Sequence, residues 1–140
     1  MWRKGTLNKF RIKNAELNIA VEKGSGKENV ILSKTFDFAL SILDLYQVLN
    51  EKKHFALANQ LVRSGTSIGA NVREAQRAVS KADFINKLSI ALKEADETDY
   101  WFELIDKKIL KVSEENKNNL DEIIRLLVRI INTTKSNNPK

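Results

Sequence analysis

The stretch ALANQLVRSGTSIGANVREAQRAV, residues 56–79, decides the fold. Its apolar and small residues recur at alternating spacings of three and four, as in a heptad seam along a helix. The seam comprises Ala58, Leu61, Gly65, Ile68, Val72, Ala75 and Val79. Glycines and hydroxyl residues are weak helix formers, so propensity alone would predict a loop at residues 64–71. Because the seam passes through this segment without a break, we predict a helix from about His54 to Val79.

The small residues within this helix have three interpretations. A phosphate-binding loop would need a glycine pattern followed by Lys and Ser or Thr, which is absent. An irregular loop would interrupt the seam. In the third interpretation a neighbouring helix approaches closely, and Ser64, Ser67 and Asn71 form hydrogen bonds locally or across the contact. We favour the third, with Gly65, Ile68, Gly69 and Val72 at the close contact.

Three further segments have helical periodicity. We expect one helix from about Ser33, as N-cap, to Leu49, and another from the Ser80 cap to about Lys108. The last follows Ser113 and reaches about Lys135. The connections are short, so neighbouring helices are expected to be antiparallel. The predicted fold class is all-α: an up-down-up-down four-helix bundle over residues 30–136. A flexible or weakly ordered basic extension at residues 1–29 precedes it, and a tail at 137–140 follows.

The first predicted helix carries two apolar faces. Leu32, Phe36, Ala39 and Leu43 lie on one, and the second is centred about 120° away. A monomeric bundle needs only one broad apolar arc per helix, so the second face predicts a homo-oligomer. The alternative is a wide core within a single bundle. The expected interface residues are Ile31, Phe38, Ile42, Leu45 and Leu49, with Ile90, Trp101 and Leu104 from the third helix.

Composition excludes several kinds of chemistry. The 140 residues include no cysteine, which excludes disulfides and thiolate sites, and a single histidine, His54. A di-iron bundle would need two Glu-x-x-His motifs, and a His-based triad has no support. We therefore predict no catalytic, metal-binding or cofactor-binding residues. No apolar run approaches the ~20 residues of a membrane span, and the basic N-terminus lacks the apolar part of a signal peptide, so a cytoplasmic location is expected.

The net charge of +6 is concentrated near the N-terminus. Residues 1–27 contain seven basic and two acidic residues, whereas residues 28–140 contain 17 and 16. Trp2 and Phe10, placed among these cations, could stack on nucleic-acid bases. The alternative is a solvated arm without a binding role.

A cationic strip is the candidate binding surface of the bundle. Arg63, Arg73, Arg77 and Lys81 fall within about 80° of one another, provided that their helix continues through Ser80. Such a line of cations could follow the phosphates of RNA or DNA. The alternative is a solvated face, neutralised in part by Glu74 and by acidic residues of the third helix.

Four blocks of sequence resemble a known family. They are NVILSKTFDFA (residues 29–39), QLVRSGTSIGANVREA (60–75), SKADF (80–84) and LSIALKEADETDYW (88–101). Together they are similar to the bacterial four-helix-bundle proteins encoded in intervening sequences of large-subunit ribosomal RNA genes. That family includes the accessory variability protein of diversity-generating retroelements. The resemblance spans about residues 28–135 and implies a homopentameric, barrel-like ring. For the retroelement branch it also implies nucleic-acid binding and a reverse-transcriptase partner.

The near-neutral bundle differs from the strongly basic surface of the retroelement branch, and it favours the intervening-sequence branch. We therefore expect a non-enzymatic, oligomeric bundle that binds RNA or DNA weakly through backbone contacts. The alternative is an assembly or adaptor scaffold that engages a protein partner, such as a reverse transcriptase, without binding nucleic acid itself.

Overall fold

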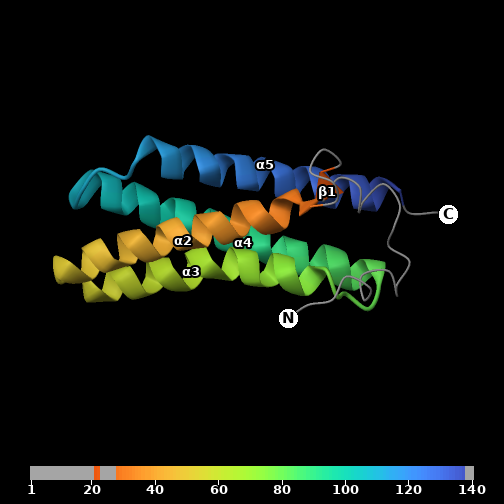
Figure 1. Cartoon of the computed structure of the whole chain (residues 1–140), viewed down its shortest axis with the longest axis horizontal. Coiled ribbons are helices and arrows are strands. Elements are labelled where there is room, and N and C mark those ends of the chain that lie inside the picture. The colour runs from red at the N-terminus through yellow and green to blue at the C-terminus, as the bar shows by residue number, and fades with distance from the viewer. Residues whose placement is uncertain (1–20, 23–27, 138–140) are drawn as a thin grey trace.

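The computed structural model describes residues 21–22 and 28–137. Within them, four helices lie side by side in one elongated bundle (Figure 1): α2 (Val30–Glu51), α3 (Phe55–Ala75), α4 (Lys81–Lys108) and α5 (Glu114–Ser136). The prediction of an all-α fold with four helices is confirmed. In Figure 1 each helix runs back along the one before it. Gly65 of α3 faces Ile42 of α2, and Thr98 Oγ1 of α4 donates a hydrogen bond to Ser64 Oγ of α3 at 2.9 Å.

A short antiparallel strand pair precedes α2, where we expected no regular structure. It joins β1 (Val21–Glu22) to β2 (Glu28–Asn29), with Val21 opposite Asn29 and Glu22 opposite Glu28. The predicted Gly-Ser-Gly linker, the rest of the N-terminal extension and residues 138–140 of the predicted tail lie outside the described residues.

α2 begins four residues earlier than predicted, and Ser33 is not its N-cap. Asn29 is the cap, because its side-chain oxygen accepts a hydrogen bond from the Leu32 amide at 3.3 Å. The amide nitrogen of the same side chain donates to Gln76 Oε1 at 2.9 Å. Asn29 therefore caps α2 and attaches its start to the chain that follows α3.

α3 ends at Ala75 rather than at Val79, so our predicted end was wrong. Gln76 is buried, and its side chain donates to the Val72 carbonyl at 3.2 Å. Val79 lies outside the helix and is 72% exposed. The predicted start of α4 is confirmed, because Ser80 Oγ accepts from the Asp83 amide at 3.0 Å and the Asp83 carboxylate accepts from the Val79 amide at 3.1 Å.

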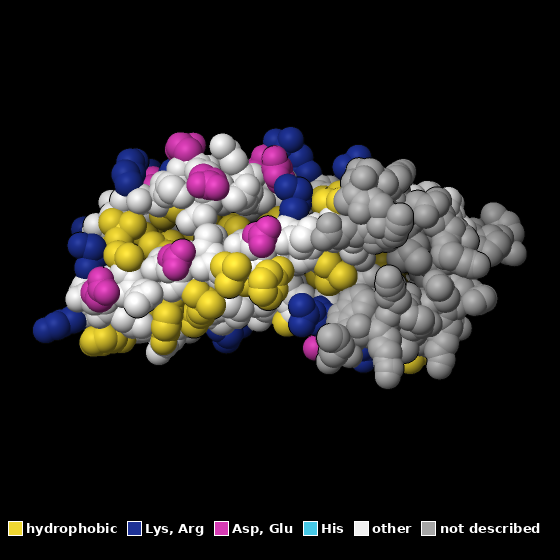
Figure 2. All heavy atoms as spheres, in the orientation of Figure 1, with side chains coloured by type: hydrophobic (Ala, Val, Ile, Leu, Met, Phe, Trp, Pro, Cys, Tyr) yellow, Lys and Arg dark blue, Asp and Glu magenta, His cyan; other side chains and the backbone are white. Residues whose placement is uncertain are grey.

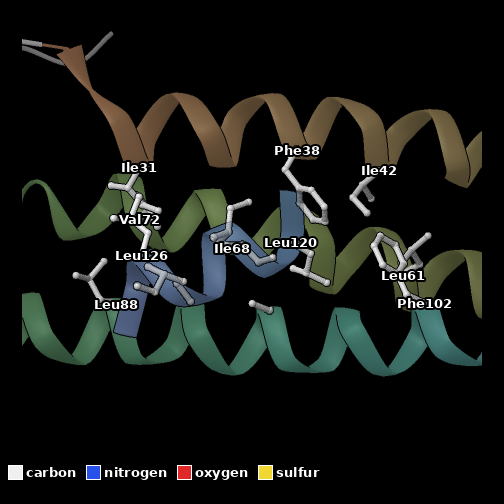
Figure 3. Close-up of a cluster of buried hydrophobic side chains, with 14 of the residues drawn as sticks. Ile31, Phe38, Ile42, Leu61, Ile68, Val72, Leu88, Phe102, Leu120 and Leu126 are labelled. Atoms are coloured by element: carbon white, nitrogen blue, oxygen red, sulfur yellow. The ribbon is translucent and has the colours of Figure 1, made fainter. Parts of the chain in front are cut away.

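The core lies along the axis between the four helices (Figure 3). Its centre contains Phe38 of α2 and Phe102 of α4, whose rings are 6.1 Å apart. The core also contains Ile31, Phe38, Ile42, Leu45 and Leu49, the complete set that we predicted for the oligomer interface on α2. That assignment is wrong: these residues are the inward face of α2, and the other apolar face points outward.

Two glycines of α3 explain which face of α2 turns inward. A Cβ on Gly65 would lie 2.8 Å from Ile42 Cγ1, and a Cβ on Gly69 would lie 3.3 Å from the Thr35 carbonyl oxygen. At Gly65 a side chain would force Ile42 to shift, and at Gly69 the Thr35 backbone would have to give by a few tenths of an ångström. The Thr35 and Ile42 side of α2 therefore fits against α3. This fit buries the five apolar residues of the inward face. Each fully buried Ile, Leu or Phe side chain contributes about 1.5–3 kcal/mol to the free energy of unfolding.

Candidate nucleic-acid interface

The predicted cationic strip does not lie along one helix. Arg63 and Arg73 belong to α3, Arg77 lies in the turn after it, and Lys81 is the first residue of α4. The prediction of four aligned cations required α3 to continue through Ser80. It fails because α3 ends at Ala75 and the Ser80 cap starts a new helix.

Arg63 is separated from the other three and is engaged by acidic residues of α4. Its guanidinium donates to Glu97 Oε2 at 2.6 Å and lies 3.7 Å from Glu94 Oε1. Trp101 Nε1 donates to the same Glu97 oxygen at 3.0 Å. Glu97 was not predicted as a site residue. Its position one helical turn before Trp101 indicated that the two side chains could contact each other. Arg63 thus connects α3 to α4 through an ion pair at the surface.

The other three cations of the predicted strip lie at one end of the bundle, together with Lys135 in the last turn of α5. We call this the basic end and define it by Arg73, Arg77, Lys81 and Lys135. Lys81 Nζ donates to the Asn137 carbonyl at 3.3 Å, so the start of α4 lies beside the end of α5 (Figure 1). Lys135 was not predicted, although a basic residue in the last turn of a helix was visible in the sequence. Nearby Glu74 is paired with Lys87 at 3.2 Å.

A hollow of about 320 Å³ lies next to Arg73, between α2 and α3. Arg73 and Glu74 line it together with Phe36, Ala39 and Gly69. It adjoins the outward apolar face of α2, whose exposed stripe we define as Phe36, Leu40 and Leu43. Figure 2 shows hydrophobic side chains gathered along this side of the bundle.

The three interface residues predicted on the third helix lie at the surface of α4. Ile90 and Trp101 are half-buried, and Leu104 is exposed. These three residues therefore give α4 an apolar surface, whereas the α2 residues predicted for the same interface are buried in the core.

The outer side of α4 also carries acidic residues that oppose phosphate binding. Burial raises the pKa of Asp99, and the negative charges of Glu103, Asp96 and Asp121 raise it further. Residues 28–137 contain 16 basic and 16 acidic residues, so the described bundle has no overall attraction for polyanions. Any such attraction is local to the basic end.

Over residues 21–22 and 28–137, no three His, Asp or Glu side chains group as metal ligands. In the same residues, no helix combines the length and hydrophobicity needed to cross a membrane.

Comparison with known proteins identifies a family and a similar crystal structure. No curated protein matches the chain. A crystal structure from Bacteroides thetaiotaomicron, described as a protein with unknown function from the S23 ribosomal protein family, is 49% identical to this chain. The match covers 72% of this chain and 97% of that one, with a TM-score of 0.67. Residues 27–133 match the family model described as 23S rRNA-intervening sequence protein. The chain therefore belongs to the 23S rRNA-intervening sequence protein family.

Proposed function

We propose that this protein is a non-enzymatic, homo-oligomeric helical bundle that binds RNA or DNA weakly, through phosphate contacts at the basic end. The observation that carries the proposal is the grouping of Arg73, Arg77 and Lys81 around the turn between α3 and α4. The family name, which refers to ribosomal RNA, favours a nucleic acid as the ligand.

The small number of cations on the bundle accounts for weak binding. Each phosphate contact releases counterions from the nucleic acid, so affinity grows with the number of cations that reach the backbone. The bundle offers only a few, and Arg63 is already paired with Glu97. The N-terminal segment, which precedes α2 in the sequence, would supply further cations. Residues 1–27 contain seven basic and two acidic residues.

The apolar surfaces of α2 and α4 support the homo-oligomer. The exposed stripe of α2 and the Ile90, Trp101 and Leu104 surface of α4 are different patches. A contact between unlike patches on successive copies generates a ring when the rotation closes. The subunit number of five comes from the family resemblance alone.

The test is binding of short RNA and DNA across a salt series. Arg73→Glu with Arg77→Glu should weaken binding about tenfold or more and reduce the slope of log affinity against log salt by about two. The matched control is Lys107→Glu with Lys108→Glu, at the opposite end of the bundle, which should leave both quantities near wild type. Unchanged binding in the arginine variant would contradict the assignment. Loss of binding only on deleting residues 1–20 would move the site to the N-terminal segment.

An adaptor scaffold is the second candidate function. The observations that favour it are the balanced charge of residues 28–137 and the pairing of Arg63 with Glu97. In that case the exposed apolar surfaces would engage a protein partner, such as a reverse transcriptase. Neither the wild type nor the control would then bind nucleic acid at low salt.

A further inference from the structure

A groove separates α2 from α5 and contains two hollows. The first, about 210 Å³, is lined by Asp37 and Phe38 of α2 and by Asn119 of α5. The second, about 360 Å³, is lined by Asp44 and Val48 of α2 and by the Val112–Asn116 segment at the start of α5. Glu115 lines both. Helix pairs in a bundle normally fill this space with side chains, so a groove of this size can receive another segment.

The groove is negatively charged and lacks matching cations. No ion pair within residues 28–137 involves Asp37, Asp44 or Glu115. Two lysines line the groove, but Lys34 is paired with Glu122 at 2.8 Å and Lys111 with Asp106 at 3.5 Å. Figure 2 shows a row of acidic side chains over α2 and further acidic side chains over α5. An occupant with several positive charges would therefore complement this groove.

The strand pair attaches the N-terminal segment near the start of α2. β1 is antiparallel to β2 and Val21 lies opposite Asn29, the residue before α2, so residues 1–20 join the described chain beside the start of α2. α2 has 22 residues and is about 33 Å long. Twenty residues span up to about 65 Å when extended and about 30 Å when helical. Either conformation reaches along most of the groove.

The sequence of that segment has the required chemistry. Residues 1–20 contain Arg3, Lys4, Lys9, Arg11 and Lys13, and their single acidic residue is Glu16. Phe10 and Ile12 lie between the last three cations. We propose that residues 1–20 dock into the α2–α5 groove of their own chain, with the cations beside Asp37, Asp44 and Glu115 and the apolar side chains in the hollows. Docking withholds these cations from nucleic acid, so the two ligands compete for the segment.

Cross-linking in the full-length protein tests this docking. The chain has no cysteine, so Asn8→Cys with Asn116→Cys places one thiol on the segment and one in the groove. The matched control is Asn8→Cys with Asn86→Cys, on the exposed surface of α4. With a short bismaleimide at low salt, the groove pair should cross-link within one chain about tenfold faster than the control, since docking raises the effective concentration. High salt should remove most of that excess.

Charge variants separate docking from chance proximity. Asp37→Asn with Asp44→Asn, added to the groove pair, should bring its cross-linking rate close to that of the control. Circular dichroism checks that the helices persist in the variant. Equal rates in the groove and control pairs would overturn the proposal. So would a product with the mass of two chains, which would assign the groove to the segment of a neighbouring copy.

Discussion

α2 contacts its two neighbours in different ways. Against α3 it fits so closely that Gly65 and Gly69 leave no room for an added methyl group without adjustment. Against α5 it leaves two hollows, and the Lys34–Glu122 ion pair bridges the two helices at the surface. The close contact fixes the rotation of α2 about its axis, and thereby decides which apolar face is core. The open contact leaves carboxylates and space for another segment.

Of these two contacts of α2, the close one with α3 should give the larger stability effect. Gly65→Ala introduces a Cβ 2.8 Å from Ile42, a fully buried branched side chain. We expect a net loss of about 1–2 kcal/mol, because overpacking exceeds the gain of about 1 kcal/mol in helix propensity. Gly69→Ala is the matched control, since its Cβ would meet Thr35 oxygen atoms at 3.3 Å. It should remain within about 0.5 kcal/mol of wild type, because the propensity gain offsets the tight contact. Denaturant unfolding measures both, and equal stabilisation by the two alanines would show that α2 is not held at Gly65.

A smaller effect is expected on the open side. Lys34→Met removes the hydrogen bond and the charge that hold the pKa of Glu122 below its usual range. A carboxyl with a lowered folded pKa adds stability above its unfolded pKa and loses it as the pH falls through the folded value. The variant should therefore unfold at a slightly lower temperature than wild type at pH 7, and the difference should vanish once the pH falls below the lowered pKa of Glu122. A difference independent of pH would mean that Lys34 acts through packing rather than through this pair.

Sequence periodicity predicted most of the fold. The predicted seam of α3 is buried except for Val79, and Ser80 and Ser113 cap α4 and α5 where predicted. α2 has two stripes about 120° apart, and periodicity cannot rank them. The choice depends on the glycines of another helix, a long-range contact that no local pattern contains.

The candidate site was harder to predict for a related reason. The alignment of Arg63 with Lys81 depended on a helix end, and helix ends respond to tertiary contacts such as the Asn29–Gln76 hydrogen bond. The partner of Arg63 lies 34 residues further along the chain and becomes its neighbour only when α3 and α4 pair. In contrast, the placement of Arg73 and Arg77 near a turn required only that one helix stop and another begin.

The most direct test of this account places the same charge on either side of α2. Ile42→Asp puts a carboxylate in the core and should cost about 4 kcal/mol or more, so that helical circular dichroism is lost. Leu43→Asp, one residue further and 45% exposed, should keep its helical signal. Light scattering should then show the wild type as an oligomer and Leu43→Asp near the monomer mass of 16.0 kDa. A folded Ile42→Asp, or a Leu43→Asp with the wild-type mass, would contradict the assignment of the two faces.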